Sequence, residues 1–314
     1  MKVMPPPLAV PAAAPRPRVE WEETPCLLCG SDCWTLLLEA PDRAAGGSGL
    51  WFAVVQCQDC GLCFTNPRPT AACMEQFYPA GYRPHRPRQP QSRSVWRWLR
   101  AGRPSRRRPI PCGGRGRLLD FGCGNGGFLE DMHRRGWQVT GVDASPVAVQ
   151  HVRAELGLPA LAGSLPHPDL EEARFDLITM WHSLEHVHAP LEVLREAHRL
   201  LAPGGRLAVA VPNIDSLAFR WFGSCWFGLD LPRHLTHFAP WTLQLMLERA
   251  GFRVGPVRML RRSGWLRWSA RLARQNPSAW RWQRWLGIPF ASRLVAGYSR
   301  LTGQSDSMVI TAER

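Results

Sequence analysis

The sequence contains a single lysine, Lys2, so arginine carries nearly all of its positive side-chain charge. It also lacks any run of apolar residues long enough to cross a lipid bilayer, which argues against a membrane-spanning helix. Pro5, Pro6 and Pro7 interrupt the apolar N-terminal stretch that a signal peptide would need unbroken. We therefore predict a cytoplasmic protein with a disordered, Pro/Ala-rich tail at residues 1–20.

Acidic residues are absent from two segments. Twelve arginines and no acidic residue lie between Gln76 and Leu119, and eleven arginines and no acidic residue lie between Arg253 and Ser305. The net charge of +14 therefore comes from these segments, and the rest of the chain is net negative. Such basic segments suit an anionic lipid surface, a nucleic acid or an anionic substrate. A solvated arginine-rich face without a partner is the alternative.

Ten cysteines in a cytoplasmic chain favour metal binding over disulfides. Four of them form two Cys-x-x-Cys pairs, each followed by glycine: Cys26, Cys29, Cys57 and Cys60. Two such pairs complete a tetrahedral, structural Zn²⁺ site. The stretches Trp34–Leu38 and Leu50–Val55 predict the strands of a zinc-ribbon hairpin between the pairs. Because one ribbon buries little core, the metal would supply much of the folding energy of this module, placed at residues 21–82.

Cys33 and Cys63 lie near these pairs in the sequence. Six cysteines could hold an iron–sulfur cluster, but the paired spacing favours zinc and leaves these two as packing residues.

A glycine-rich turn between a buried strand and a helix organises the rest of the chain. The strand ends with Asp120 and Phe121, and the turn continues through Gly122, Cys123, Gly124, Asn125 and Gly126. Glycine lets the backbone turn sharply and approach a ligand where a Cβ would collide. The following helix, at about residues 128–135, points its N–H groups and positive dipole end into the turn. The glycines also match a dinucleotide fingerprint, so they do not name the ligand by themselves.

Two carboxylates separate the candidate ligands. Asp120 lies two residues before the first glycine, where it suits a cationic amino group and would repel a pyrophosphate. Asp143 ends the next strand, at the distance where a carboxylate meets ribose hydroxyls. One acid for an amino group and one for a sugar describe S-adenosylmethionine better than a nicotinamide cofactor.

Strands alternate with helices from residue 117 onward, which is the pattern of a doubly wound parallel sheet. After Asp143, strands are predicted at 158–161, 175–180, 206–211, 253–260 and, reversed in direction, 308–312. Helices are predicted at 146–156, 191–201 and 241–250. Ser145 is the expected N-cap of the first of these helices, with Pro146 at its first position.

Residues 118–252 resemble a class I S-adenosylmethionine-dependent methyltransferase of the ubiquinone type or methyltransferase-domain-23 type. The ribbon resembles the zinc-binding segment that precedes this fold in some bacterial members. The resemblance implies an α/β fold with a doubly wound, seven-stranded, mostly parallel, Rossmann-like sheet over residues 117–314. It implies these cofactor-binding residues: Asp120, Gly122, Cys123, Gly124, Asn125, Gly126, Asp143, Ala144, Ser164, Leu165 and Trp181.

The segment after the fourth predicted strand, residues 181–187, resembles the corresponding motif of ubiquinone-type O-methyltransferases. A histidine oriented by a neighbouring carboxylate could remove a proton from an acceptor hydroxyl, so His186 and His182 are candidate bases. If the segment is helical, Glu185 and His186 diverge by roughly a hundred degrees and one of them faces the cofactor. A structural role around the methionine end is the alternative.

A second histidine cluster, residues 232–238, resembles a motif that this family carries between the fifth and sixth strands, near the acceptor pocket. His234 and Arg233 could hold or deprotonate an acidic acceptor, or hydrogen bonds could simply pin the loop. His237 lies three residues from His234, but no third metal ligand is obvious. Phe77, Tyr78 and Tyr82 after the ribbon could form a lid over the site or pack between domains.

Two further segments have unusual composition. Residues 83–116 form an Arg/Pro-rich linker. An Arg/Trp-rich helical insertion is predicted at about 261–304, with Trp265 and Trp268 at helical spacing. Tryptophan plus arginine on an amphipathic helix is typical of an element lying in a membrane interface, here at the inner membrane face through residues 261–301. A helical hairpin over the acceptor pocket is the alternative.

The leading hypothesis is a methyltransferase that acts on an oxygen or carbon of a small-molecule or lipid-linked acceptor. No Asn/Asp-Pro-Pro-aromatic tetrad follows the fourth predicted strand, which argues against methylation of exocyclic base amines. An RNA methyltransferase that grips phosphates with the ribbon and the arginine segments is a second possibility. A non-catalytic cofactor-binding protein is a third.

Overall fold

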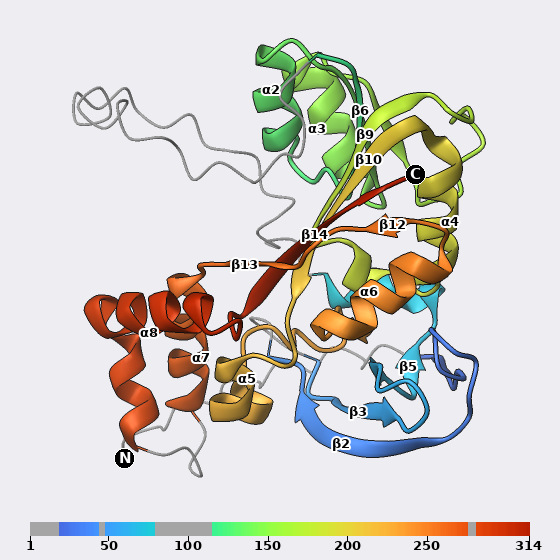
Figure 1. Ribbon diagram of the computed structural model, residues 1–314. Helices are drawn as coiled ribbons and strands as arrows, with labels where there is room; N and C mark the ends of the chain where they lie inside the picture. Colours follow the sequence, from blue (N-terminus) through green and yellow to red (C-terminus); the bar gives the residue numbers. More distant parts are fainter. Residues whose placement is uncertain (1–18, 44–47, 79–114, 276–280) are drawn as a thin grey trace, which may run out of the picture.

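The computed structural model describes residues 19–43, 48–78, 115–275 and 281–314 (Figure 1). Most of the predicted tail, Tyr82 and nearly all of the predicted linker at 83–116 lie outside these residues.

A mostly parallel sheet forms the centre of the described part of the chain, with eight strands. Its order is β12-β14-β10-β9-β6-β7-β8, and β13 also pairs with β14. The strands span Arg117–Phe121 (β6), Gln138–Asp143 (β7), Ala160–Ala162 (β8), Phe175–Trp181 (β9), Leu201–Pro212 (β10), Arg253–Val254 (β12), Arg258–Leu260 (β13) and Ser307–Glu313 (β14). The chain winds outward from β6 in both directions, so the point of reversal lies between β6 and β9. Ligands bind at the carboxyl edge of such a point, and the doubly wound fold is confirmed.

The sheet differs from the predicted seven strands at its antiparallel edge. The predicted strand at 253–260 consists of two short strands, β12 and β13, that each pair with β14. Gly255 and Pro256 separate them. The Gly255 N–H donates to the Thr311 carbonyl oxygen, and a Cβ on Gly255 would lie only 2.7 Å from that oxygen. Proline has no N–H to continue the ladder, so the strand breaks there.

Helices cover both faces of the sheet (Figure 1). They are α2 (Gly127–Arg134), α3 (Pro146–Leu156), α4 (Pro190–Leu200) and α6 (Pro240–Arg249), whereas α5 (Leu217–Phe222) lies away from the sheet and packs against α7 (Ser263–Ala273). Leu118 packs in the core beneath α2 and α3, whereas Leu119 packs in the core beneath α4 and α6. This division follows from the strand, because successive side chains point to opposite faces. Ser145 caps α3 as predicted, with its side chain accepting from the Ala148 N–H.

The insertion before β14 is helical, as the spacing of its tryptophans predicts. It contains α7 (Ser263–Ala273), η5 (Arg281–Gly287) and α8 (Pro289–Leu301), which lie together beyond one end of the sheet (Figure 1). Within the ranges that the structure covers, no helix combines the length and the apolar character that a bilayer crossing requires.

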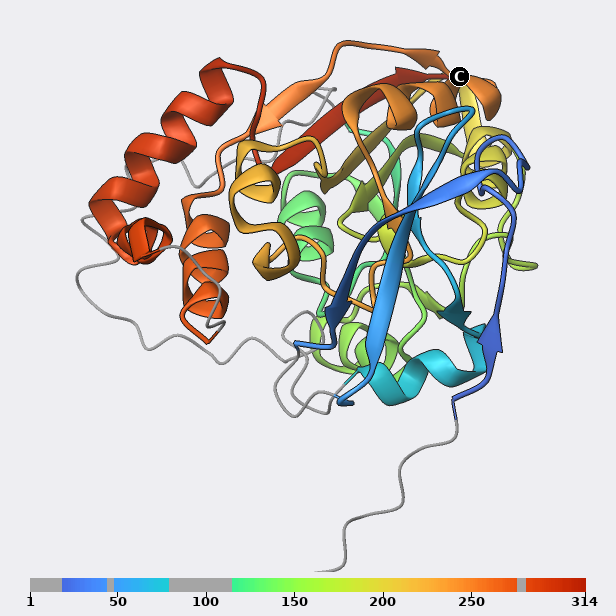
Figure 2. The same cartoon turned by 90° about the horizontal axis from the view of Figure 1, so that it is seen from below.

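The N-terminal ribbon consists of short strands and one 3₁₀ helix. Its elements are β1 (Trp21–Glu22), β2 (Trp34–Pro41), β3 (Trp51–Cys57), β4 (Cys63–Thr65), β5 (Arg68–Pro69) and η1 (Ala71–Phe77). β2 and β3 form the predicted hairpin. Seen from below, these strands lie against the α/β part of the chain (Figure 2).

The ribbon shares a sheet and a core with the α/β part. β4 pairs antiparallel with β11 (Thr236–His237), a strand from the second histidine cluster, so the ribbon sheet has the order β11-β4-β3-β2. Leu28 and Phe64 of the ribbon belong to the same buried cluster as Phe238 and Leu243. The ribbon therefore forms one wall of the region around the second histidine cluster.

Candidate active site and metal centre

The glycine turn holds the ends of two central strands together. Gly122 has a φ of +74°, which glycine adopts without strain, and a Cβ there would lie 2.4 Å from the Ser183 Cβ. The Ser183 hydroxyl in turn donates to the Phe121 carbonyl oxygen over 2.8 Å. The turn after β6 and the segment after β9 are therefore in direct contact. A larger residue at position 122 would separate them.

Asp120 and Asp143 end adjacent parallel strands. Asp120 is buried, and its Oδ1 accepts a hydrogen bond of 2.6 Å from the Thr179 hydroxyl on β9. Asp143 accepts from the Gly124 N–H at Oδ2 (2.7 Å) and from the Ser145 N–H at Oδ1 (2.9 Å). A carboxylate oxygen can accept more than one hydrogen bond, so such a group suits an amino group or a sugar hydroxyl. The two carboxylates and the glycine turn therefore fit the amino and ribose ends of S-adenosylmethionine.

The other residues predicted to bind the cofactor follow the same edge of the sheet. Asn125 Oδ1 accepts from the Gly127 N–H at the start of α2, and Cys123 is buried. Trp181, at the end of β9, packs edge-on against Phe128 with ring centroids 5.5 Å apart.

Ala144 is exposed directly after β7, whereas Ser164 (exposed) and Leu165 (buried) follow β8. The roles of all these residues toward the cofactor stay predictions.

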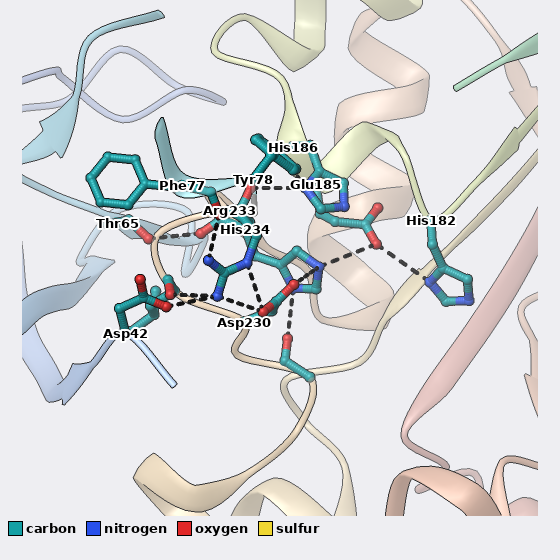
Figure 3. Close-up of polar contacts among 12 residues, drawn as sticks. Asp42, Thr65, Phe77, Tyr78, His182, Glu185, His186, Asp230, Arg233 and His234 are labelled. Carbon is teal, nitrogen blue, oxygen red and sulfur yellow. Dashed lines mark hydrogen bonds and ion pairs between the residues drawn. The ribbon is translucent and has the colours of Figure 1, made fainter. Parts of the chain in front are cut away.

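A buried glutamate and three histidines lie together next to this edge (Figure 3). The side chain of Glu185 is fully buried, and neither of its oxygens accepts a hydrogen bond from any described residue. His182 Nδ1 lies 3.3 Å and His234 Nε2 lies 3.9 Å from Glu185 Oε1. The His186 and His234 rings meet edge-on, with centroids 4.6 Å apart. The structure thus brings together all three predicted catalytic histidines.

The geometry around Glu185 differs from the predicted divergence of Glu185 and His186. The segment Leu184–His186 is a 3₁₀ turn, and ligand atoms of Glu185, His186 and His234 lie within 4.8 Å of one another. The second histidine of the later cluster, His237, points elsewhere and contacts the Thr65 hydroxyl at 3.2 Å. His234 therefore completes a three-residue group with Glu185 and His186, a group that could hold a metal ion.

Hydrogen bonds to backbone carbonyls fix the tautomers of two histidines. His186 Nδ1 lies 2.9 Å from the Arg233 carbonyl oxygen, and His234 Nδ1 lies 2.8 Å from the Gly228 carbonyl oxygen. A carbonyl oxygen only accepts, so each Nδ1 carries the proton and each Nε2 keeps its lone pair. The Tyr78 hydroxyl also lies 3.1 Å from His186 Nδ1, so this ribbon-side aromatic reaches the cluster.

Burial sets the protonation of the cluster. It raises the pKa of Glu185 above the usual carboxyl value, although the nearby histidines oppose the shift. Burial, assisted by His234, lowers the pKa of His186 to about 4, and burial also lowers the pKa of His234. Both histidines are therefore neutral at pH 7.

Two members of this region adopt backbone conformations that L-residues rarely use. His182 has a φ of +58° and Asp230 a φ of +34°. Non-glycine residues in this region are strained, and such residues concentrate at functional sites. The His182 side chain is 24% exposed, more than the side chains of Glu185 and His234.

Arg233 joins the site to the ribbon. Its guanidinium donates to Asp230, to Asp42 of the ribbon and to the Phe77 carbonyl oxygen. Burial opposes its charge, but the two carboxylates outweigh burial and raise the pKa of Arg233. These contacts agree with the alternative prediction that hydrogen bonds hold the loop of the second histidine cluster in place. No pattern in the sequence points to Asp42 as a partner of Arg233, and only the Asp-x-x-Arg spacing indicates Asp230.

The four paired cysteines converge at one point in the ribbon. Sγ of Cys26 lies 3.4 Å from Sγ of Cys60, and Sγ of Cys29 lies 3.5 Å from Sγ of Cys57. All four sulfur atoms lie within 4.8 Å of one another, the arrangement that a tetrahedral thiolate site requires.

Cys33 and Cys63 lie outside this group. Cys63 is buried, as predicted for a packing residue, and burial raises the pKa of its thiol to about 12. Cys33 is exposed, so the prediction that it packs was wrong: it comes just before β2, the outer strand of the ribbon sheet.

Curated proteins similar to this chain match its central region. Ubiquinone biosynthesis O-methyltransferase of Pseudomonas aeruginosa (strain LESB58) is 35% identical over 109 residues, 33% of this chain and 47% of that protein. The mitochondrial enzyme of the same name from Schizosaccharomyces pombe (strain 972 / ATCC 24843) is 37% identical over 109 residues, 32% of this chain and 40% of that protein. The chain thus spans less than half the length of these relatives.

Several solved structures resemble part of this chain. The [4+2]-cyclase SpnF is 24% identical, with 65% of this chain and 76% of that chain covered and a TM-score of 0.47. An S-adenosylmethionine-dependent methyltransferase from Mesorhizobium loti is 21% identical, with 70% and 97% covered and the same TM-score.

The model of the methyltransferase domain family matches residues 95–256, more than half of the chain. The match spans the glycine turn, both strand-end carboxylates and both histidine clusters. This protein therefore belongs to the methyltransferase domain family, and its resemblance to class I S-adenosylmethionine-dependent methyltransferases is confirmed.

Proposed function

We propose that this protein transfers the methyl group of S-adenosylmethionine to a hydroxyl oxygen of a small-molecule acceptor. The main support for this proposal is that the buried cluster of Glu185 and the histidines lies beside the strand ends that carry Asp120 and Asp143. Family membership supports methyl transfer, and the names of the curated relatives favour an oxygen over a carbon.

The cofactor would be held by residues that the fold brings to one edge. Asp120 would bind the amino group and Asp143 the ribose hydroxyls, while the glycine turn lets the backbone approach the methionine end. When bound, S-adenosylmethionine supplies the sulfonium methyl for an in-line displacement. Positioning the acceptor opposite the methyl group then provides most of the rate.

His182 is the residue best placed to take the acceptor proton. Its Nδ1 lies 3.3 Å from Glu185 Oε1, and although the two atoms form no hydrogen bond in this geometry, the carboxylate favours the tautomer with the proton on Nδ1 and the lone pair on Nε2. Arg262 Nη2 and the Ser307 hydroxyl both lie 3.4 Å from Nε2, and because the arginine can only donate, the acceptor hydroxyl would have to replace it before Nε2 can take the acceptor proton. A base at this position contributes a factor of about 10² to 10⁴ in rate. His186 and His234 lie beside Glu185, but their Nε2 atoms carry lone pairs and cannot donate to it.

The ribbon cysteines would hold a structural Zn²⁺. Burial raises the pKa of Cys26 to about 11, so four clustered thiolates need a cation to offset their charge. Because the ribbon sheet includes β11, the metal would also stabilise the loop that carries His234.

Calorimetry and a methyl-transfer assay test this function. We expect S-adenosylmethionine to bind the full chain, Asp143→Ala to weaken binding at least 10-fold, and Asp169→Asn, an exposed carboxyl far from the turn, to leave it unchanged. A labelled methyl donor with a panel of hydroxyl-bearing small molecules, with and without a hydrocarbon tail, should yield methylated product. His182→Gln should lower turnover about 100-fold or more with cofactor affinity unchanged.

Full turnover by His182→Gln would remove this histidine as the base. Cofactor binding without methylation of any acceptor would favour the non-catalytic alternative. Methylation of RNA that co-purifies with the protein, in place of the small acceptors, would favour an RNA methyltransferase.

A further inference from the structure

Helix α8 turns its large apolar side chains away from the protein. Four of them are 59% to 89% exposed: Phe290, Leu294, Tyr298 and Leu301. At 100° per residue these positions form one stripe along the helix. The buried face of α8 carries small residues instead: Ser292, Ala296 and Ser299. A helix that simply packs on a water-soluble protein has the opposite arrangement.

The neighbouring 3₁₀ helix, which packs against α8, also exposes large apolar side chains. In η5, Trp285 is 68% exposed and Trp282 is 44% exposed, and Ile288 between η5 and α8 is 44% exposed. α8 lies at the outer end of the molecule, away from the central sheet (Figure 1). Contiguous exposed apolar residues of this size mark an interaction surface.

The charged residues beside the apolar stripe are all arginines. Arg293 and Arg300 are exposed on α8, on the same flank of the stripe. The whole segment from Arg253 to Ser305 contains arginine and no acidic residue. An apolar face bordered by arginine matches an anionic lipid surface, in which acyl chains take the apolar side chains and headgroups take the charge.

The insertion that carries this surface also borders the proposed base. α8 packs against α7, and the Trp265 ring of α7 lies 5.2 Å from the His182 ring. Phe227 packs against both Trp265 and Trp268, so an aromatic row runs from His182 toward the exposed side of α7. A bound membrane would therefore lie on the element that forms one side of the acceptor region.

We propose that α8 and η5 dock this protein on an anionic bilayer, and that its acceptor is a lipid that resides in that bilayer. This proposal rests on the proposed function and names the class of its acceptor. Phe290, Leu294 and Tyr298 insert at the level of the headgroups, with Arg293 and Arg300 against the lipid phosphates.

Vesicle flotation of the full chain tests the docking surface. Vesicles of phosphatidylcholine with phosphatidylglycerol should carry the protein at least 10-fold more strongly than vesicles of phosphatidylcholine alone. The triple variant Phe290→Ser, Leu294→Ser, Tyr298→Ser should lose at least 10-fold in binding. Arg293→Gln and Arg300→Gln should each weaken binding about fivefold at low salt, from roughly 1 kcal/mol per basic residue.

Val147→Ser is the matched control, because Val147 is 71% exposed on α3, and it should leave binding unchanged. The triple variant should bind S-adenosylmethionine and methylate a water-soluble, tail-free hydroxyl acceptor as the unaltered chain does, but lose at least 10-fold on an acceptor with a hydrocarbon tail in vesicles.

Failure of the unaltered chain to float, or flotation of the triple variant at full strength, would overturn the docking proposal. Equal turnover of the tailed acceptor by both proteins would overturn the acceptor class. Binding of RNA that depends on the same α8 residues would assign the surface to nucleic acid instead. If the unaltered chain binds vesicles but does not bind S-adenosylmethionine, the proposed function is refuted and the docking proposal stands.

Discussion

The Arg233 guanidinium lies 3.0 Å from the Asp42 carboxylate, with both side chains almost completely buried. This ion pair connects the loop that carries His234 to the connection between β2 and β3 of the ribbon. Asp230 shares the same guanidinium, and Phe77 and Leu231 supply carbonyl oxygens. Arg233 therefore has a partner for most of its donors without contact with solvent.

Removal of Arg233 should destabilise the fold. In Arg233→Met the carboxylate of Asp42 stays buried without its cation, and broken buried pairs lose about 3 to 5 kcal/mol. Urea denaturation should report a loss of that size. The exposed pair Arg220–Asp215 is the control, and Arg220→Ala should change the free energy of unfolding by less than about 1 kcal/mol. A change in Arg233→Met as small as in the control would contradict this account.

Glu185 should lower the free energy of unfolding of the protein but be needed for methyl transfer. Its buried oxygens accept no hydrogen bond from the residues described, so a neutral side chain of the same shape relieves an unfavourable burial. We expect Glu185→Gln to unfold at the same or a higher denaturant concentration but to methylate about 100-fold more slowly. Glu196 is the control: it is also buried but forms a two-point pair with Arg199. Glu196→Gln should lose stability and keep turnover, and the reverse pattern would refute a catalytic role for Glu185.

The ribbon should bind one zinc ion through four thiolates. We expect elemental analysis to find one ion per chain, and Cys57→Ser to lose it, while Cys33→Ser retains it because Cys33 lies outside the sulfur cluster. Loss of the ion should lower Tm and speed amide exchange at Leu235, whose N–H bonds to the Glu185 carbonyl oxygen. A metal-free chain with unchanged Tm would exclude a structural role for the metal.

Stability should fall as the pH drops below about 6.5. Burial lowers the pKa of His237 to about 3, so between pH 6 and pH 4 the unfolded chain binds a proton here that the folded chain does not. Stability from a depressed pKa is complete above the unfolded value and is lost toward the folded one. His237→Gln should therefore flatten the dependence by about 1.4 kcal/mol per pH unit.

His133, exposed on α2, is the control for this measurement, and His133→Gln should leave the slope unchanged. A slope in His237→Gln equal to that of the unaltered chain would show that His237 is protonated in the folded state.

Local signals in the sequence predicted the central strands, the capped helix α3 and the order of elements. The pairing of the cysteines was predictable because their spacing alone brings them together. The cluster around Glu185 was only half predictable. His182 and His186 lie in the same short segment, but His234 reaches Glu185 through a loop held by residues distant in sequence.

Contacts across long separations account for what the sequence could not supply. No local pattern relates Asp42 to Arg233, and nothing in Thr236–His237 signals a strand that pairs with Cys63–Thr65. The break between β12 and β13 was readable from Gly255 and Pro256, but the predicted strand ran through them. In α8, spacing indicates an amphipathic helix, yet only the fold shows that its small residues face inward.

The pairing of β4 with β11 has a consequence for how this protein can be divided. A fragment that begins at residue 115 would keep every predicted cofactor residue but would present β11 as an uncovered sheet edge beside Phe238. Open edges next to apolar surface promote association between copies. The N-terminal third is thus a structural complement to the cofactor-binding part, and the two have to be inherited, expressed and engineered together.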